Sequence, residues 1–556
     1  MSILNNGQLI PEDVDILLDK WKCQSVYGNE QPPTPEFCIF KNVALGLEML
    51  KHHVDNDSNM VFHTDVDVDG IGTTYIMKKT LDNLNSNKHC LFINKDKVHG
   101  ISERHANFFN KTNVGLMIIT DSSCNDVDII KQFNCDVLCI DHHDLLHTDT
   151  CGVCNDGVHR YIIINSTIDN DTFEHDSKWL RSKNISAFEN INPHKGTQAM
   201  SCGLVVYEFL RLYCECFANP KLLENLMLYQ WVGITLITDV IDTLNDRNQW
   251  YLNKTVFNNY VEQSLRIMMP YVNKNKATLD KSYIEYSFAP LINKAIRAGQ
   301  SATALDIVIN RPQDISLLSE YAKQQQDAVN KACYVSSMNF GNEVLTPKLF
   351  SEERIIMNIS DLGINKNYSG VIASRLCGDN HKNAAVFVIN DNQLYKGSFR
   401  GRYKEVNYRK HFESIGTDVY AQGHPGAFGF EMTKEQLEKA MNTLTLIEPN
   451  VEPKPLLSLG NIDPSKQGIY HITDLNNFKK LGYIWKISIG NSKVTSGDEI
   501  NIRVSASDVV LKSTKGKLFI YDVCGLECKA FSALTGKFFN VYAEYTNEIN
   551  FYIRQI

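Results

Sequence analysis

The chain has 556 residues, of which 64 are acidic and 56 are lysine or arginine, and its formal net charge is −8. This length is too great for one hydrophobic core and suggests three or four domains of roughly 100–200 residues each. The negative charge excludes a simple basic nucleic-acid binder. The lack of a signal-like N-terminus and of any apolar run of about 18 residues predicts a soluble intracellular protein without membrane contact.

Residues 1–45 are mixed in composition and are predicted to form an N-terminal arm. From residue 46 to 255, apolar strand-like runs alternate with helical patterns. The predicted strands are Met60–His63, Leu91–Asn94, Leu116–Thr120, Val137–Ile140 and Tyr161–Ile164, and the clearest helices are Thr73–Leu84 and Met200–Phe217. This alternation predicts an α/β fold with a doubly wound, mostly parallel sheet, which binds its ligands at the carboxyl ends of the strands.

The most informative stretch is Val61–Thr74, in which an apolar strand end is followed by acidic residues and two glycines. His63, Asp65, Asp67 and Asp69 occur two residues apart, and alternate side chains of an extended chain share one face. Such crowded groups repel one another and resist desolvation unless cations lie between them. We therefore favour a divalent metal site over the alternative, a solvated acidic turn that caps the next helix.

Three further element ends carry acidic or imidazole side chains. The strand Leu116–Thr120 is followed by Asp121, and the strand Val137–Ile140 is followed by Asp141, His142 and His143. The apolar, helix-like stretch Trp231–Asp239 ends in another aspartate. One such aspartate often caps a helix, but four such ends indicate a shared site.

In this order, the four motifs Asp65–Gly70, Asp121, Asp141–His143 and Ile237–Ile241 resemble those of the DHH phosphoesterase superfamily. The Asp-x-Asp-x-Asp-Gly form of the first motif is similar to that of RecJ-type single-strand-specific exonucleases. The segment Pro290–Arg297 also resembles that family. Three further segments resemble its DHH-associated domain: Ser369–Leu376, Gly397–Arg400 and Gly423–Gly429. The resemblance covers about residues 55 to 450.

The resemblance implies four domains after the arm. Residues 46–255 are expected to form the DHH catalytic domain, 256–350 a helical connector, and 351–450 a smaller α/β DHH-associated domain that binds substrate. Residues 451–556 show about five short strand patterns and are expected to form a β-barrel-like domain of the OB type. Its aromatic side chains suit either stacking on single-stranded bases or a hydrophobic core.

The resemblance also implies roles for the site residues. Mixed carboxylate and imidazole ligands suit two Mn²⁺ or Mg²⁺ ions that clamp an in-line phosphoryl displacement. Asp67, Asp121 and Asp239 would hold one ion, with His63 or Asp65 nearby, while Asp69, Asp121 and His142 would hold the second. His143 would either contact the scissile phosphate or protonate the leaving oxygen, and Asp141 would orient its neighbour. Candidates for gripping phosphates are Asn293, Arg297, Arg400 and His424.

The function that this resemblance implies is 5′→3′ hydrolysis of single-stranded DNA to mononucleotides, in DNA repair or recombination. Two alternatives remain open: a DHH phosphodiesterase of short oligoribonucleotides or cyclic dinucleotides, and a non-catalytic nucleic-acid-binding scaffold. We expect a monomer that acts in the cytoplasm, or as a viral protein in the host cytoplasm, and a single-strand-binding protein or a helicase is a candidate partner.

Overall fold

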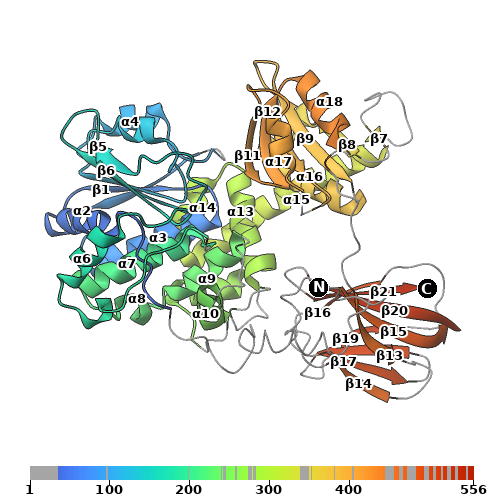
Figure 1. Cartoon of the computed structure of the whole chain (residues 1–556). Helices are drawn as coiled ribbons and strands as arrows, with labels where there is room; N and C mark the ends of the chain where they lie inside the picture. Colours follow the sequence, from blue (N-terminus) through green and yellow to red (C-terminus); the bar gives the residue numbers. More distant parts are fainter. Residues whose placement is uncertain are drawn as a thin grey trace. The chain divides into compact units, whose positions relative to one another are not determined.

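The structure is a computed structural model, in which the chain forms two compact units (Figure 1). The larger unit comprises Glu36–Asp242 and Lys254–Val451, and the smaller comprises Met1–Pro35, Thr243–Asn253 and Glu452–Ile556. The residues described are 35–95, 98–197, 199–239, 241, 246–256, 260–272, 279, 283–338, 350–351, 354–380, 382–403, 406–444 and 447, together with nine strands between residues 456 and 555. Most of the predicted N-terminal arm and the acidic, proline-rich stretch 448–455 lie outside this set.

The larger unit begins with a six-stranded sheet in the order β2-β1-β3-β4-β6-β5. All neighbouring strands pair in parallel except β5, which runs antiparallel to β6. The strands are β1 (Met60–Thr64), β2 (His89–Ile93), β3 (Leu116–Thr120), β4 (Asp136–Asp141), β5 (Cys151–Val153) and β6 (Arg160–Asn165). The five predicted strands are therefore all present, with ends shifted by no more than two residues.

Helices cover both faces of this sheet (Figure 1). On one face Val61, Ile119 and Cys139 pack against α4 and α5, while on the other Leu138 and Ile164 lie against Gly46 of α2. The helices are α2 (Val43–Asp55), α3 (Val68–Asn83), α4 (Glu103–Phe109), α5 (Val127–Ile130), α6 (Phe173–Arg181), α7 (Cys202–Phe217), α8 (Leu222–Asn225) and α9 (Tyr229–Thr238), with a 3-10 turn η1 (Ser186–Phe188). The predicted α/β fold with a parallel sheet is confirmed.

A run of helices follows the sheet. Within the larger unit these are α11 (Gln263–Val272), the π-helical turn η2 (Ile284–Phe288), α13 (Ala289–Arg297), α14 (Ser301–Asn310), η3 (Pro312–Leu318) and α15 (Ser319–Met338). They are preceded by α10 (Asp246–Val256), which falls mostly in the smaller unit. Buried polar contacts join this run to helix α3 of the first domain: the Tyr75 hydroxyl of α3 donates to Glu262 (2.9 Å) and accepts from Ser264 of α11 (2.7 Å). The run therefore continues the packing of the first domain.

The second part of the larger unit is a six-stranded sheet in the order β11-β12-β10-β9-β8-β7. Its strands are β7 (Phe350–Ser351), β8 (Arg354–Asn358), β9 (Asn383–Ile389), β10 (Tyr395–Arg400), β11 (Tyr420–His424) and β12 (Ala427–Met432). One face packs against α16 (Ser369–Asn380) and the other against α17 (Tyr408–Glu413) and α18 (Lys434–Asn442), and the 3-10 turns η4 (Ser360–Leu362) and η5 (Lys366–Tyr368) precede α16. This is a smaller α/β domain with a mostly antiparallel sheet.

The smaller unit contains two β-sheets. One has five strands in the order β13-β15-β20-β21-β16 and the other has four in the order β14-β17-β18-β19. The strands are β13 (Leu456–Ile462), β14 (Gly468–Ile472), β15 (Ile484–Lys493), β16 (Ile500–Val504), β17 (Val509–Thr514), β18 (Lys517–Asp522), β19 (Glu527–Phe531), β20 (Gly536–Tyr545) and β21 (Ile549–Gln555). Two sheets and nine strands, in place of about five, leave the expected OB-type barrel unconfirmed.

Of the helices within the described residues, none combines the length and the apolar character needed to cross a membrane.

Candidate metal centre

The first acidic motif is a strand-to-helix turn and not an extended segment. Strand β1 ends at Thr64, and Asp67 caps α3 by accepting a hydrogen bond from the Gly70 amide (2.9 Å). Asp69 already lies in the first turn of α3, which explains why this helix begins five residues before the predicted Thr73. The acidic residues therefore converge through the tight turn, and period-two spacing is not the cause.

Asp121 follows β3 in a backbone conformation that is unusual for a residue with a side chain. Its φ is 65°, and its amide donates to the carbonyl of Ile140 in β4 (3.0 Å). Aspartate tolerates this left-handed region better than most residues. The conformation directs the chain back across the edge of the sheet, where β4 delivers Asp141 and the two histidines.

The carboxyl ends of the parallel strands bring these motifs together with the end of α9. Potential ligand atoms within 4.8 Å of one another form three groups: Asp65, Asp67 and Asp121; Asp69, His142 and Asp239; and Asp121, Asp141, His142 and His143. We refer to Asp65, Asp67, Asp69, Asp121, Asp239 and His142 as the acidic cluster. It differs from the sequence expectation in grouping Asp239 with Asp69 and His142.

His142 determines what the acidic cluster can hold. Its Nδ1 lies 2.8 Å from the Met200 carbonyl, which can only accept a hydrogen bond, so Nδ1 carries the hydrogen. Burial and the neighbouring His143 lower the pKa of His142 to about 4, so the ring is neutral and Nε2 presents a lone pair. That lone pair faces carboxylate oxygens at 3.2 Å (Asp121), 3.5 Å (Asp239) and 3.9 Å (Asp69). Lone pairs that face one another at these distances repel unless a proton or a metal cation lies between them.

The pKa values of the carboxylates in the acidic cluster also indicate a site that favours a cation. Burial, together with the charges of Asp69 and Asp67, raises the pKa of Asp239 to about 9, and burial raises that of Asp69 to about 7. The same causes raise the pKa of Asp121 well above its usual range. The Oδ2 atom of Asp239 is buried without a hydrogen-bond partner. Oxygen and imidazole donors around such an orphaned oxygen fit hard divalent cations such as Mn²⁺ or Mg²⁺.

Two members of the cluster have their own supports. The Asp69 oxygens accept hydrogen bonds from the Cys202 amide (3.0 Å) and the Gly203 amide (3.1 Å) at the start of α7, where the helix dipole favours an anion. One Asp65 oxygen lies 2.6 Å from Nδ1 of His99, a residue for which the sequence motifs give no indication. Burial raises the pKa of Asp65, and His99 opposes that shift.

His143 differs from His142 because it pairs with a single carboxylate. Asp141 Oδ1 accepts from His143 Nδ1 (2.8 Å) and from the backbone amide of His142 (2.7 Å). Burial opposes charge on the ring, but Asp141 raises the pKa of His143 to about 10, and the same contacts hold the pKa of Asp141 below its usual range. The His143 side chain is 55% exposed, so a protonated imidazole lies at the mouth of the cluster.

The structure does not bring His63 into the cluster. His63 is still within β1 and shares a face with Val61, where its ring lies 5.6 Å from Phe92 and 5.5 Å from His105 between ring centroids. Burial, followed by the charge of His105, lowers its pKa to about 3. Among the described residues, the metal-ligand groups contain no His63 atom.

The four predicted phosphate contacts lie on three elements. Arg297 ends α13 with Asn293 one turn before it, Arg400 ends β10 and His424 ends β11. Burial and then Arg297 lower the pKa of Arg400 to about 10, and burial, followed by His143 and Arg400, lowers that of His424. Arg297, Arg400 and His424 therefore lie close enough to influence one another, and His424 also responds to the charge of His143. Two arginines beside an imidazole that can donate a hydrogen bond suit an anion. We call Arg297, Arg400 and His424 the basic group.

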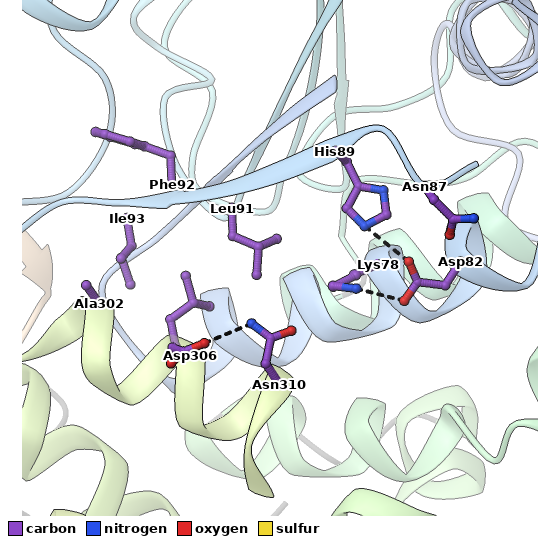
Figure 2. A pocket seen from close by; sticks show the side chains of 11 residues that line it. Lys78, Asp82, Asn87, His89, Leu91, Phe92, Ile93, Ala302, Asp306 and Asn310 are labelled. Carbon is purple, nitrogen blue, oxygen red and sulfur yellow. Dashed lines mark hydrogen bonds and ion pairs between the residues drawn. The ribbon is translucent and has the colours of Figure 1, made fainter. Parts of the chain in front are cut away.

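A pocket of about 690 Å³ lies beside strand β2 (Figure 2). Its lining includes Lys78 and Asp82 of α3, His89 of β2, and Ala302 and Asp306 of α14, but no residue of the acidic cluster. Figure 2 shows α14 running below β2, with Ala302 beside Ile93. The pocket is separate from the candidate metal centre.

Gly70 permits the turn of the first motif, since a Cβ atom there would lie 2.7 Å from the carbonyl oxygen of Asp65. Because that neighbour is backbone, Gly70→Ala should displace the Asp65 loop and weaken Mn²⁺ binding by about tenfold or more, as measured by calorimetry. Gly378→Ala is the matched control, because a Cβ at Gly378 meets nothing within 4 Å. Wild-type affinity in Gly70→Ala would show that the close approach is not required.

Comparisons with known proteins agree with this architecture. Residues 351–447 match the model of the DHHA1 domain. A SPbeta prophage-derived protein of Bacillus subtilis (strain 168), provisionally named as a single-strand DNA-specific exonuclease, YorK, is 19% identical over 449 residues, covering 73% of this chain and 69% of the relative. The counterpart from Bacillus phage SPbeta has the same identity and coverage.

Solved structures of RecJ from Thermus thermophilus have a similar fold. The complex with Mn²⁺ has a TM-score of 0.64 at 13% identity, covering 97% of this chain and 74% of that chain. The complex with Mg²⁺ has a TM-score of 0.58 at 14% identity, covering 95% and 71%. At these identities the likeness establishes the fold.

Proposed function

We propose that this chain, which belongs to the DHH/RecJ-like family by its motifs, its DHHA1 domain and its RecJ-like fold, is a metal-dependent exonuclease. Its substrate is single-stranded DNA, which it degrades from the 5′ end to mononucleotides. The observation that carries the hydrolytic function is the convergence of buried carboxylates on the Nε2 lone pair of His142. The choice of single-stranded DNA rests on the name of the Bacillus relative.

Two divalent cations suit two of the three ligand groups. Asp65, Asp67 and Asp121 would hold one, and Asp69, His142 and Asp239 the other, with Asp121 between the groups because its Oδ1 is also 3.2 Å from His142 Nε2. The bound cations would supply neutralisation of the charge that develops on the phosphate oxygens during in-line displacement.

The chain's own residues supply the remaining steps. Protonated His143, held by Asp141, donates from Nε2 either to a phosphate oxygen or to the leaving oxygen. The basic group binds phosphates through guanidinium and imidazole donors. Asn293 shares a helix face with Arg297, at a separation of four residues, and assists it.

End-labelled substrates test this proposal. With Mn²⁺ present, wild-type protein should release labelled mononucleotide from 5′-labelled single-stranded DNA at once, and only late from 3′-labelled DNA. Asp67→Ala should release neither, because it removes a ligand from the first group.

Three other substrates distinguish the alternatives. Duplex DNA should resist, and preferential turnover of short RNA or cyclic dinucleotides would replace the proposed substrate with that of other DHH phosphodiesterases. Mn²⁺ binding without turnover of any substrate would indicate a scaffold.

The biological setting is proposed on narrower grounds. The match to a phage protein fits a viral protein that acts in the host cytoplasm. Four expectations stay predictions. They are a role in repair or recombination, a helicase or single-strand-binding partner, the monomeric state and the domain boundaries.

A further inference from the structure

His99 contacts the acidic cluster from a loop that none of the four motifs includes. Its Nδ1 lies 2.6 Å from Asp65 Oδ2, and the following Gly100 amide lies 3.4 Å from Asp65 Oδ1. An ionised carboxylate can only accept, so Nδ1 carries the hydrogen of this bond. Both oxygens of Asp65 are thus fixed from one short loop.

Hydrogen bonds and close packing fix the described residues on both sides of His99. The buried Asn94 side chain donates from Nδ2 to the carbonyls of Val98 (2.7 Å) and Gly100 (2.8 Å), which closes the loop around His99. Gly100 has a φ of 75°, and a Cβ there would lie 2.7 Å from Ser123 Oγ, which itself accepts from the Ile101 amide (2.9 Å). Only glycine fits both the conformation and the space.

The loop is also joined to the helices that follow the first domain. The Ser301 hydroxyl, at the start of α14, donates to the carbonyls of Asn94 and Lys95 at the end of β2. Figure 2 shows the adjacent Ala302 of α14 beside Ile93 of β2. Contacts from Ser301, Asn94 and Ser123 thus hold the backbone on both sides of His99.

We infer that His99 is a positioning residue, whose Nδ1–H orients the Asp65 carboxylate so that the group of Asp65, Asp67 and Asp121 can bind a divalent cation. The inference rests on the proposed metal-dependent function and deepens it. Partners that orient a ligand in this way are typically worth 10–100-fold in metal affinity. In this pair a histidine orients an aspartate, whereas in the pair of Asp141 and His143 the aspartate orients the histidine.

Two substitutions separate the Nδ1 donor from the bulk of the ring. Asparagine places an amide N–H near the position of Nδ1, whereas glutamine places it near the position of Nε2. His99→Asn should keep Mn²⁺ affinity within about threefold of wild type, and His99→Gln should lose about 10–100-fold. Affinity is measured on the chelator-stripped full chain from the electron paramagnetic resonance signal of free Mn²⁺, without DNA. The melting temperatures of the metal-free proteins should agree.

His159→Ala is the matched control, because it removes a histidine from a histidine–aspartate pair with Asp156 that lies outside the cluster, and it should not change Mn²⁺ affinity. Equal affinities for His99→Asn and His99→Gln would overturn the inference, as would losses that track a lower melting temperature. A wild-type protein whose Mn²⁺ affinity depends on His99 as expected, but which leaves single-stranded DNA intact, would refute the proposed function alone. A wild type that binds no Mn²⁺ would refute both.

Discussion

Asp239→Asn should reduce hydrolysis by at least about 10³-fold and should at the same time stabilise the metal-free protein. The loss of activity follows from removing a ligand whose Oδ2 is buried, has no hydrogen-bond partner and lies 3.5 Å from His142 Nε2. The gain in stability follows from the crowding of Asp239 with Asp69 and Asp67, which is relieved when the carboxylate becomes a neutral amide.

The pH dependence of this gain has a definite sign. The pKa of Asp239 is about 9 in the folded chain, above its usual value of about 3.8, so folding takes up a proton between these limits. The free energy of unfolding of metal-free wild type therefore falls as the pH rises from about 4 to 9. The melting temperature of Asp239→Asn should exceed that of wild type by more at pH 8 than at pH 5, in the presence of a chelator.

Addition of Mn²⁺ should reverse the order of the two melting temperatures. The cation stabilises the wild type, whereas the variant lacks one of the ligands that would bind it. Asp391→Asn, at an exposed position in the turn between β9 and β10, is the control and should match wild type in activity and stability. An active Asp239→Asn variant would remove Asp239 from the metal centre, and an unchanged melting temperature would contradict the repulsion.

The ends of buried strands made much of the site predictable from sequence. Thr120 and Ile140 are buried strand residues, and the aspartate that follows each of them lies at the sheet edge where the carboxyl ends of the parallel strands meet. Asp239 is predictable for the same reason, since the apolar residues before it are buried in α9. Apolar runs that end in acids reveal such positions because burial of an unpaired carboxylate is costly.

His63 and His99 mark the limit of that reasoning. Period-two spacing places His63 with the acids only if β1 continues to Asp69, but the chain turns after Thr64 and Asp67 caps a helix. His99 lies six residues after the end of β2, so its approach to Asp65 depends on loop closure by Asn94 and Ser123. A search for polar side chains after the end of β2 would have found His99 only if it had extended six residues beyond Ile93.

The β-rich C-terminal part shows a different limit. Alternating residues indicate β15, β16, β18, β20 and β21, but β13, β14, β17 and β19 carry weaker patterns. Whether strands close into one barrel or separate into two sheets depends on pairings between distant residues, such as β16 with β21, which local spacing does not encode. The side chains of residues 456–555 lie outside the described residues, so the predicted aromatic stacking surface stays a prediction.

Asp141→Asn should lower turnover at pH 8 by about 10²–10⁴-fold, the range expected for a positioned acid or donor, while leaving Mn²⁺ affinity within a few-fold of wild type. Asp141 is hydrogen-bonded to His143, and its charge raises the pKa of His143 to about 10. Without that charge, the pKa of His143 falls toward its ordinary value of about 6.5. In wild type the imidazolium persists to about pH 9, whereas in the variant it is lost above about pH 6.5.

The ratio of variant to wild-type turnover should therefore fall as the pH rises from 6 to 8, at saturating Mn²⁺ so that changes in metal occupancy do not contribute. His143→Gln is the companion variant, since it removes the titrating ring and should show a loss that does not vary over this range. If Asp141→Asn keeps the wild-type profile, His143 does not act as a cation. If its loss is the same at every pH, Asp141 positions the ring without setting its charge, since the loss then has no titrating component.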